Sequence, residues 1–199
     1  MMKKNQLYPV FLKVTSLNTL IVGGGNVALE KLSFLLKSSP EAKVTMISPF
    51  YREETIAKAK EGKVRMIEGD YDSSLLEGKH IVIATTDVPR VNMKVYNDCK
   101  ERSILVNLAD NPPYCDFYMG GIVTKGNVKI GISTNGKSPT MAKRLRQFFE
   151  SVLPEDIDDL AEYLNKYRDT IKGDFEEKVE KMNAFTKGLV GDVKNKIKE

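Results

Sequence analysis

The sequence predicts an α/β fold with a doubly wound parallel sheet, followed by a small α+β segment and a helical C-terminal tail. Three observations predict it. Short apolar runs alternate with amphipathic, helix-like stretches over the first 112 residues. Three consecutive glycines join the first apolar run to the first helical pattern. After Pro112-Pro113 the pattern changes to a hairpin and then to charged, helical sequence.

The composition is that of an ordinary globular protein. Hydrophobic residues make up 41% and charged residues 29% of the chain, and no apolar run approaches the ~18 residues of a membrane span. The net charge of +4 is too small to indicate nucleic-acid binding. The two cysteines and the single histidine, His80, show no metal-ligand spacing. We therefore expect a cytoplasmic protein with reduced cysteines and no metal site, and no nucleic-acid or membrane partner.

Residues 1–112 are predicted to form one Rossmann-like domain. Its strands are short apolar runs, and its helices carry apolar residues at helical spacing, such as Ala28, Leu32 and Leu36 in the first helix. Gly62 closes the second helix, and Val95 and Cys99 belong to the stripe of the third. Strands are expected at 18–23, 43–48, 63–68, 80–85 and 104–108, and helices at 26–38, 52–60 and 88–102.

Residues 113–150 are predicted to form a dimerisation and substrate segment, and residues 151–199 a helical domain. Strands 121–124 and 128–134 alternate around a Lys-Gly-Asn turn, which is typical of a hairpin. Ser138 and Pro139 are an N-cap and a first helical residue. The helix that follows has an apolar side, expected to be buried, made of Met141, Leu145, Phe148, Phe149 and Val152. Because one chain offers too few neighbours to cover this segment, we expect a homodimer.

The glycine run suits a dinucleotide. Gly23, Gly25 and Ala28 fit G-x-G-x-x-A between a strand and a helix, where bare backbone and the helix dipole meet a pyrophosphate. The predicted contacts in this run are Gly23, Gly24, Gly25, Asn26 and Val27.

The rest of the cofactor site is predicted from the ends of the other strands. No acidic residue ends the second strand, so the backbone of Pro49 and Phe50 is expected to hold the adenosine, with NAD favoured and NADP left open. Thr85, Thr86 and Asn107 follow or end neighbouring strands and are expected beside the nicotinamide ribose.

Two polar residues at this edge have a second, structural interpretation. Asp87 precedes a predicted helix and suits an N-cap as well as a ribose contact. Asp110 stands at the carboxyl end of the fifth strand, where ligands of doubly wound sheets bind, but it equally suits an Asx turn before the two prolines.

Four stretches together resemble one family. They are VGGGNVALEK (22–31), ATTDVPRVN (84–92), VNLADNP (106–112) and GISTNGKSPTMAKRLR (131–146). In order and spacing they are similar to the siroheme synthase N-terminal family, whose members are precorrin-2 dehydrogenases and, in some cases, sirohydrochlorin ferrochelatases. The resemblance covers residues 7 to 150, and the sequence is similar to a short, stand-alone form of the family.

The resemblance implies NAD-dependent oxidation of precorrin-2 to sirohydrochlorin, with Asp110 as the catalytic general base. It leaves open whether Fe²⁺ is then inserted as a second substrate. It also implies that cations bind the carboxylates of the tetrapyrrole, whereas the residues alone equally suit a solvated helix face. The predicted substrate contacts are Thr134, Lys137, Ser138, Lys143 and Arg146. Glu30 and Lys143 depart from the family pattern, which has arginine at these places.

Three other functions compete with this interpretation. A non-catalytic NAD-binding regulatory module would explain the glycines but not the basic helix or the NLADNP turn. A short-chain oxidoreductase is disfavoured because no Tyr-x-x-x-Lys pair occurs at a suitable place. A chelatase without dehydrogenase activity is the narrowest alternative.

Overall fold

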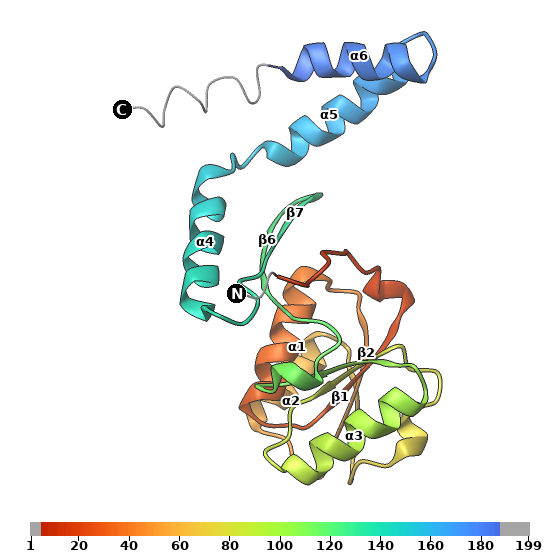
Figure 1. Cartoon of the computed structure of the whole chain (residues 1–199), viewed down its shortest axis with the longest axis vertical. Coiled ribbons are helices and arrows are strands. Elements are labelled where there is room, and N and C mark those ends of the chain that lie inside the picture. The colour runs from red at the N-terminus through yellow and green to blue at the C-terminus, as the bar shows by residue number, and fades with distance from the viewer. Residues whose placement is uncertain (1–4, 188–199) are drawn as a thin grey trace. The chain divides into compact units, whose positions relative to one another are not determined.

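The computed structural model describes residues 5–187. Five parallel strands form its central sheet in the order β3-β2-β1-β4-β5. Figure 1 shows this sheet, with β1 and β2 labelled, among the helices that cover it. The chain starts in the middle of the sheet, builds toward one side and then crosses to the other, which confirms the predicted doubly wound, Rossmann-like fold. The strands are β1 (Asn18–Val22), β2 (Lys43–Ser48), β3 (Arg65–Glu68), β4 (Ile81–Ala84) and β5 (Leu105–Leu108).

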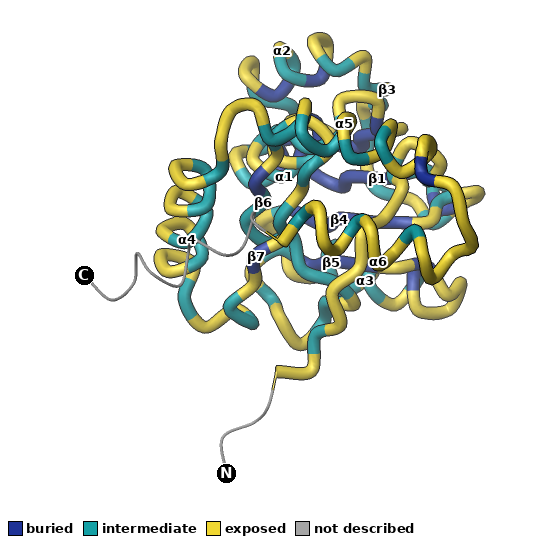
Figure 2. The backbone as a smooth tube through the Cα atoms, turned by 90° about the horizontal axis from the view of Figure 1, so that it is seen from above, coloured by how far each residue is buried: buried dark blue, intermediate teal, exposed yellow. Residues whose placement is uncertain are grey.

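Alternating residues of β1, β2 and β4 enter two separate cores. On one face Ile21 and Met46 pack with Leu32 of α1 (Asn26–Ser38) and Ala59 of α2 (Glu53–Glu61). On the other face the core includes the helix α3 (Pro89–Glu101) and the short 3₁₀ turn η2 (Ser73–Leu76). Figure 2 shows the buried backbone concentrated in the strands, as expected for a parallel sheet covered on both faces.

The helices of this sheet domain begin and end close to the predicted positions. The predicted stripe on α3 is confirmed, since Val95 and Cys99 are both fully buried. Gly62 is the C-cap of α2, as predicted. Two further 3₁₀ turns, η1 (Val14–Ser16) and η3 (Pro112–Tyr114), lie before β1 and after β5.

The remaining elements are a hairpin and three helices. The hairpin pairs β6 (Gly121–Lys125) with β7 (Val128–Ile132). The predicted cap of the next helix is confirmed, because the Ser138 hydroxyl accepts a hydrogen bond from the Met141 amide at 3.2 Å. The predicted helical tail begins with two helices, and its residues 188–199 lie outside the described chain. The helices are α4 (Pro139–Val152), α5 (Ile157–Thr170) and α6 (Phe175–Thr186).

The apolar side of α4 is uncovered within residues 5–187, as expected for a segment that has too few neighbours in one chain. Met141, Phe148 and Val152 are 57%, 56% and 52% exposed, and α4 contains no buried residue. An amphipathic helix buries its apolar side only where another element packs on it, and within residues 5–187 none covers these side chains.

Among the described residues no helix is both long and apolar enough to cross a membrane.

The chain divides into two compact units. One comprises the chain up to Ile122 together with Gly131–Arg144, and the other comprises Val123–Ile130 and the described residues from Leu145 onward. The three predicted segments have different boundaries from these units, because the hairpin and α4 each contribute to both. The site described below lies in the first unit, except for Arg146.

Candidate functional site

The glycine loop, residues 23–25, joins the end of β1 to the start of α1. Gly23 has a φ of +124°, and a Cβ there would approach the Thr85 hydroxyl oxygen to 2.5 Å. A Cβ on Gly24 would collide with the carbonyl oxygen of Phe50. The loop is therefore pressed between the carboxyl ends of β4 and β2, and a side chain at either position would push them apart.

The helix that follows the loop presents free backbone donors. Gly25 is the N-cap of α1 and offers no side-chain cap, so the first amides of the helix, at Asn26 and Val27, have no intrahelical partner. A Cβ on Gly25 would meet no atom within 4 Å. Uncapped amides at the positive end of a helix, beside open space, fit a pyrophosphate. The residues predicted for cofactor binding in this stretch are thus available for it.

The carboxyl end of β2 lies against this loop. The Arg52 amide donates to the Gly24 carbonyl at 3.1 Å, which ties the two segments together. The buried Ser48 hydroxyl donates to the Phe50 carbonyl at 2.6 Å and so shapes the turn through Pro49, while the Phe50 ring is 70% exposed. The predicted adenosine contacts, Pro49 and Phe50, are therefore placed beside the glycine loop.

Arg52 is the cation nearest in sequence to this turn. Its guanidinium pairs with Glu54, at 3.3 Å from Nε and 3.1 Å from Nη2, and this hydrogen bond lowers the pKa of the Glu54 carboxyl. An acidic residue at the end of β2 would favour NAD, and an arginine would favour a 2′-phosphate. Here Arg52 is present, but its guanidinium already pairs with the Glu54 carboxylate.

The turn after β4 is held by a side chain that sequence analysis missed. Asn92 accepts from the Thr86 amide and hydroxyl at 3.2 and 2.7 Å, and its own amide donates to the Thr86 carbonyl at 2.8 Å. The alternative role of Asp87 as helix cap is wrong, since the N-cap of α3 is Val88 and it has no side-chain cap. Asn92 ends the ATTDVPRVN motif, which was its only signal in the sequence.

Thr85 and Asn107 are buried and engaged within the fold. The Thr85 hydroxyl donates to the Val22 carbonyl at 2.8 Å. The Asn107 amide donates to the Phe117 carbonyl at 2.8 Å and contacts the Cys115 sulfur at 3.3 Å, which fastens the segment after η3 to β5. Their roles as ribose contacts stay predictions, and both shape the site through these hydrogen bonds.

Asp110 follows β5 at the same edge of the sheet. The ladder continues past the strand, because the Ala109 amide donates to the Ala84 carbonyl at 3.0 Å. Asp110 itself is exposed, has a φ of +60°, and receives no hydrogen bond on its carboxylate from residues 5–187. An Asx turn would need the N–H of residue 112, which is a proline and has none. The carboxylate is therefore free to act on a ligand.

The loop before α4 holds two of the predicted substrate residues in its own structure. The Thr134 hydroxyl accepts from the Ser138 amide at 3.2 Å and donates to the Ser138 carbonyl at 3.0 Å. Lys137 and Lys143 are exposed and form no ion pair with a carboxylate of residues 5–187. Arg146, in the second unit, pairs with Glu150 one turn along the helix. These five contacts stay predictions.

The remaining reactive residues have structural surroundings. His80 accepts the Asn18 amide on Nδ1 at 3.0 Å, which anchors the start of β1. Both cysteines are free thiols, and burial raises the pKa of Cys115 and of Cys99, the latter to about 12. Within residues 5–187 no three His, Cys, Asp or Glu side chains gather as metal ligands do.

Comparison with known proteins decides the family. A family model described as "Putative NAD(P)-binding" matches residues 10–121, which is more than half of the chain. The chain belongs to this NAD(P)-binding family. A second model, described as "Sirohaem biosynthesis protein central", matches residues 125–151 of this NAD(P)-binding protein, which confirms the resemblance drawn from the four motifs.

The NAD(P)-binding protein is also similar to longer proteins. It is 34% identical over 192 residues to the siroheme synthase of Pseudoalteromonas atlantica, covering 96% of this chain and 41% of the relative. It is 35% identical over 186 residues to that of a Psychrobacter species, covering 94% and 38%. The chain therefore spans about two fifths of these relatives. Among solved structures, "SirC, precorrin-2 dehydrogenase" has the same fold, with a TM-score of 0.74, 22% identity and coverage of 89% and 88%.

Proposed function

We propose that this protein oxidises precorrin-2 to sirohydrochlorin with NAD as hydride acceptor. One observation carries the proposal: a free carboxylate, Asp110, stands at the same sheet edge as the uncapped glycine loop. The similarity to siroheme synthases and the shared fold with a structure titled precorrin-2 dehydrogenase support this reaction over other uses of such an edge.

The cofactor is held by backbone rather than by side chains. The amides of Asn26 and Val27 would bind the pyrophosphate, and the turn at Pro49 and Phe50 would hold the adenosine. When bound, NAD supplies the acceptor for the hydride that leaves the substrate. The packing of the loop against β2 and β4 fixes the position of these donors before the cofactor arrives, so binding needs no rearrangement of the loop.

Asp110 removes the proton that must leave with the hydride. A carboxylate without a hydrogen-bond donor in the protein can accept a proton from a bound ligand, and it is an effective base if the proton lies within hydrogen-bond reach. Lys137 and Lys143, exposed and without an ion pair in residues 5–187, would attract the carboxylates of the tetrapyrrole.

The test is anaerobic incubation with precorrin-2 and NAD⁺, following the absorption of sirohydrochlorin and of NADH together. We expect both products in a one-to-one ratio. The Asp110→Asn variant should lose at least about a hundredfold in turnover while keeping NAD affinity, since asparagine tolerates the left-handed backbone but cannot take the proton. Asp70→Asn, at another exposed aspartate, is the matched control.

Each outcome of this test decides between the candidate functions. NAD binding without oxidation would identify a regulatory module and contradict the proposal, and an Asp110→Asn variant as active as Asp70→Asn would remove Asp110 from the mechanism. Adding Fe²⁺ after oxidation tests chelation, which we propose only as a second step on the same substrate. The free thiols of both cysteines suit the reducing cytoplasm, where we propose the protein works.

We also propose that the protein works as a homodimer through α4. Its apolar side, with Met141, Phe148 and Val152 exposed, is continuous along the helix and uncovered in residues 5–187. A second copy would remove this surface from water, which is the driving force for most subunit association.

A charged substitution in the centre of this side tests the dimer. Phe148→Asp should yield a monomer by light scattering on a sizing column, because an aspartate cannot be buried without a partner. Thr140→Asp, on the same helix but off the apolar side, should leave the mass unchanged. A monomeric wild-type protein at micromolar concentration would contradict the proposal.

A further inference from the structure

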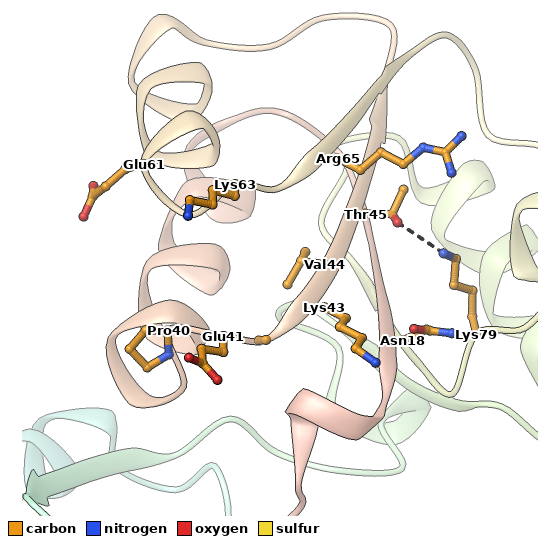
Figure 3. A pocket seen from close by; sticks show the side chains of 12 residues that line it. Asn18, Pro40, Glu41, Lys43, Val44, Thr45, Glu61, Lys63, Arg65 and Lys79 are labelled. Carbon is orange, nitrogen blue, oxygen red and sulfur yellow. Dashed lines mark hydrogen bonds between the residues drawn. The ribbon is translucent and has the colours of Figure 1, made fainter.

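A pocket of about 500 Å³ lies at the amino edge of the sheet, at the opposite end of the strands from the glycine loop (Figure 3). Along β1 the two edges are separated by roughly 15 Å, at ~3.3 Å per residue. Four cations line the pocket: Lys43, Lys63, Arg65 and Lys79. Nothing in the predicted reaction uses this edge.

The register of the parallel strands brings several polar side chains of this pocket onto one face of the sheet, whereas Glu61 and Lys63 line it from the end of α2 (Figure 3). Asn18 of β1 pairs with Lys43 of β2, and Thr45 of β2 pairs with Arg65 of β3. Paired residues of parallel strands, and residues two apart on one strand, point to the same side of the sheet. Lys79, from the loop before β4, reaches the same place and donates to the Thr45 hydroxyl oxygen at 3.2 Å, as Figure 3 shows.

The cations are not neutralised by the protein. None of the four forms an ion pair with a carboxylate of residues 5–187. Two carboxylates also line the pocket, and one of them, Glu61, already pairs with Lys58 at 2.9 Å. A concave site with four cations therefore carries an excess of positive charge that only a ligand or solvent ions can balance.

This excess charge acts on the residues themselves. The pKa of Lys79 is lowered, first by its partial burial and second by repulsion from Arg65. Two like charges held together without a counter-ion destabilise the folded chain, and a bound anion would reverse this repulsion. Clusters of like charges are typical of binding sites, because they lower the stability of the folded chain but raise its affinity for a ligand of opposite charge.

We propose that this amino-edge pocket binds a small phosphate-bearing anion through Arg65, Lys79 and Lys43. Cations from three separate strands or loops converge here, which matches the several acceptor oxygens of a phosphate better than the two of a carboxylate. The Arg65 guanidinium can hold two of these oxygens at once. Because the Thr45 oxygen already accepts from Lys79, its own proton is free to donate to the ligand.

Binding is tested on the isotope-labelled full chain saturated with NAD⁺, so that the glycine loop is occupied. Inorganic phosphate and pyrophosphate are titrated at constant ionic strength while backbone amide resonances are followed. We expect saturable shifts at Lys43, Thr45 and Lys79, and none at Gly24 or Gly25. Shifts confined to the glycine loop, or no saturable shift anywhere, would overturn the proposal.

Variants then assign the affinity to the pocket. Arg65→Gln and Lys79→Gln should each weaken phosphate binding about tenfold or more, since each removes a charged hydrogen bond. Lys94→Gln, which removes an exposed cation of α3 outside the pocket, is the matched control and should bind as the wild type does. Equal weakening in all three variants would show an effect of net charge alone and would overturn the site. Citrate binding as tightly as pyrophosphate would overturn its preference for phosphate.

Discussion

At the scale of single residues, the carboxyl edge of the sheet is shaped by glycines, which have no side chain. Three neighbouring glycines differ in what a Cβ would meet. At Gly23 and Gly24 it would meet the ends of β4 and β2, whereas at Gly25 it would meet nothing within 4 Å. The first two glycines therefore serve the fold, and the third leaves room for a ligand.

This difference predicts that two similar variants differ in stability. Gly25→Ala should keep the melting temperature of the wild type and lose NAD affinity by about tenfold or more, because its methyl group occupies the space of the pyrophosphate. Gly24→Ala should lose more than about 1 kcal/mol of stability as well, since its methyl group meets the Phe50 carbonyl.

Calorimetric titration and thermal melting measure both quantities. Gly131→Ala, where a Cβ also meets no atom within 4 Å but which lies in β7, is the control and should change neither. Unchanged NAD affinity in Gly25→Ala would place the pyrophosphate elsewhere.

A second residue-scale prediction concerns the choice of cofactor. Releasing Arg52 from Glu54 would make its guanidinium available to the 2′-phosphate of NADP. Glu54→Gln should therefore tighten NADP binding roughly fivefold or more and leave NAD binding unchanged. Glu53→Gln, one residue earlier in the same helical turn, is the control. Equal changes for both cofactors would contradict this role of Arg52.

At the scale of elements, hydrogen-bonded side chains fix the turns that follow the strands. Asn92 connects the first turn of α3 to the end of β4, and Asn107 connects β5 to the segment after η3. These contacts span loops whose backbone has few ladder partners, so the side chains replace the missing backbone hydrogen bonds. The positions of Thr86 and Asp110 at the carboxyl edge of the sheet depend on such side-chain hydrogen bonds.

Removing one of these ties should destabilise the protein measurably. Asn92→Ala loses three hydrogen bonds to Thr86, and we expect a loss of about 1–3 kcal/mol in the free energy of unfolding by urea. Asn97→Ala, on an exposed position of the same helix, should change it by less than about 0.5 kcal/mol. If the two variants unfolded at the same urea concentration, the turn would not depend on Asn92.

At the scale of the whole molecule, two apolar cores on either side of one sheet make stability sensitive to alkaline pH. Burial raises the pKa of the Cys99 thiol from 9.0 to about 12 and that of the Tyr51 hydroxyl from 10.0 to about 12. Between the ordinary pKa values of 9.0 and 10.0 and the folded value of about 12, the Cys99 thiol and the Tyr51 hydroxyl are deprotonated in the unfolded chain. In the folded chain both groups keep their protons over this range. The unfolded state thus binds fewer protons there, and stability falls as pH rises.

We therefore expect the free energy of unfolding to be fully retained below about pH 9 and to decline between pH 9 and 12. Cys99→Ala removes the thiol and should make this decline shallower, although the smaller side chain lowers stability at neutral pH. Urea unfolding of both proteins across this range measures the two slopes. Parallel slopes would show that Cys99 keeps its ordinary pKa in the folded protein.

Local patterns in the sequence were sufficient to predict a doubly wound parallel sheet and the strand-to-helix joint that the glycine loop forms, whereas the strand order came from the structure. Apolar periodicity and glycine spacing act over a few residues, so they can be read without knowing what packs where. Periodicity also identified the apolar side of α4, which residues 5–187 leave uncovered as expected, but it could not show what covers that side.

The sequence by itself determined the fold and the family, and it predicted that a dinucleotide binds at the glycine loop. Only the tertiary structure decided which polar side chains remain free for a ligand. Thr85, Asn107 and Thr134 are engaged inside the protein, Asp110 is free, and Lys43, Arg65 and Lys79 meet in a pocket that no motif marks. The physical reason is that hydrogen-bond partners and strand register depend on residues far apart in the chain, and these meet only when the sheet forms.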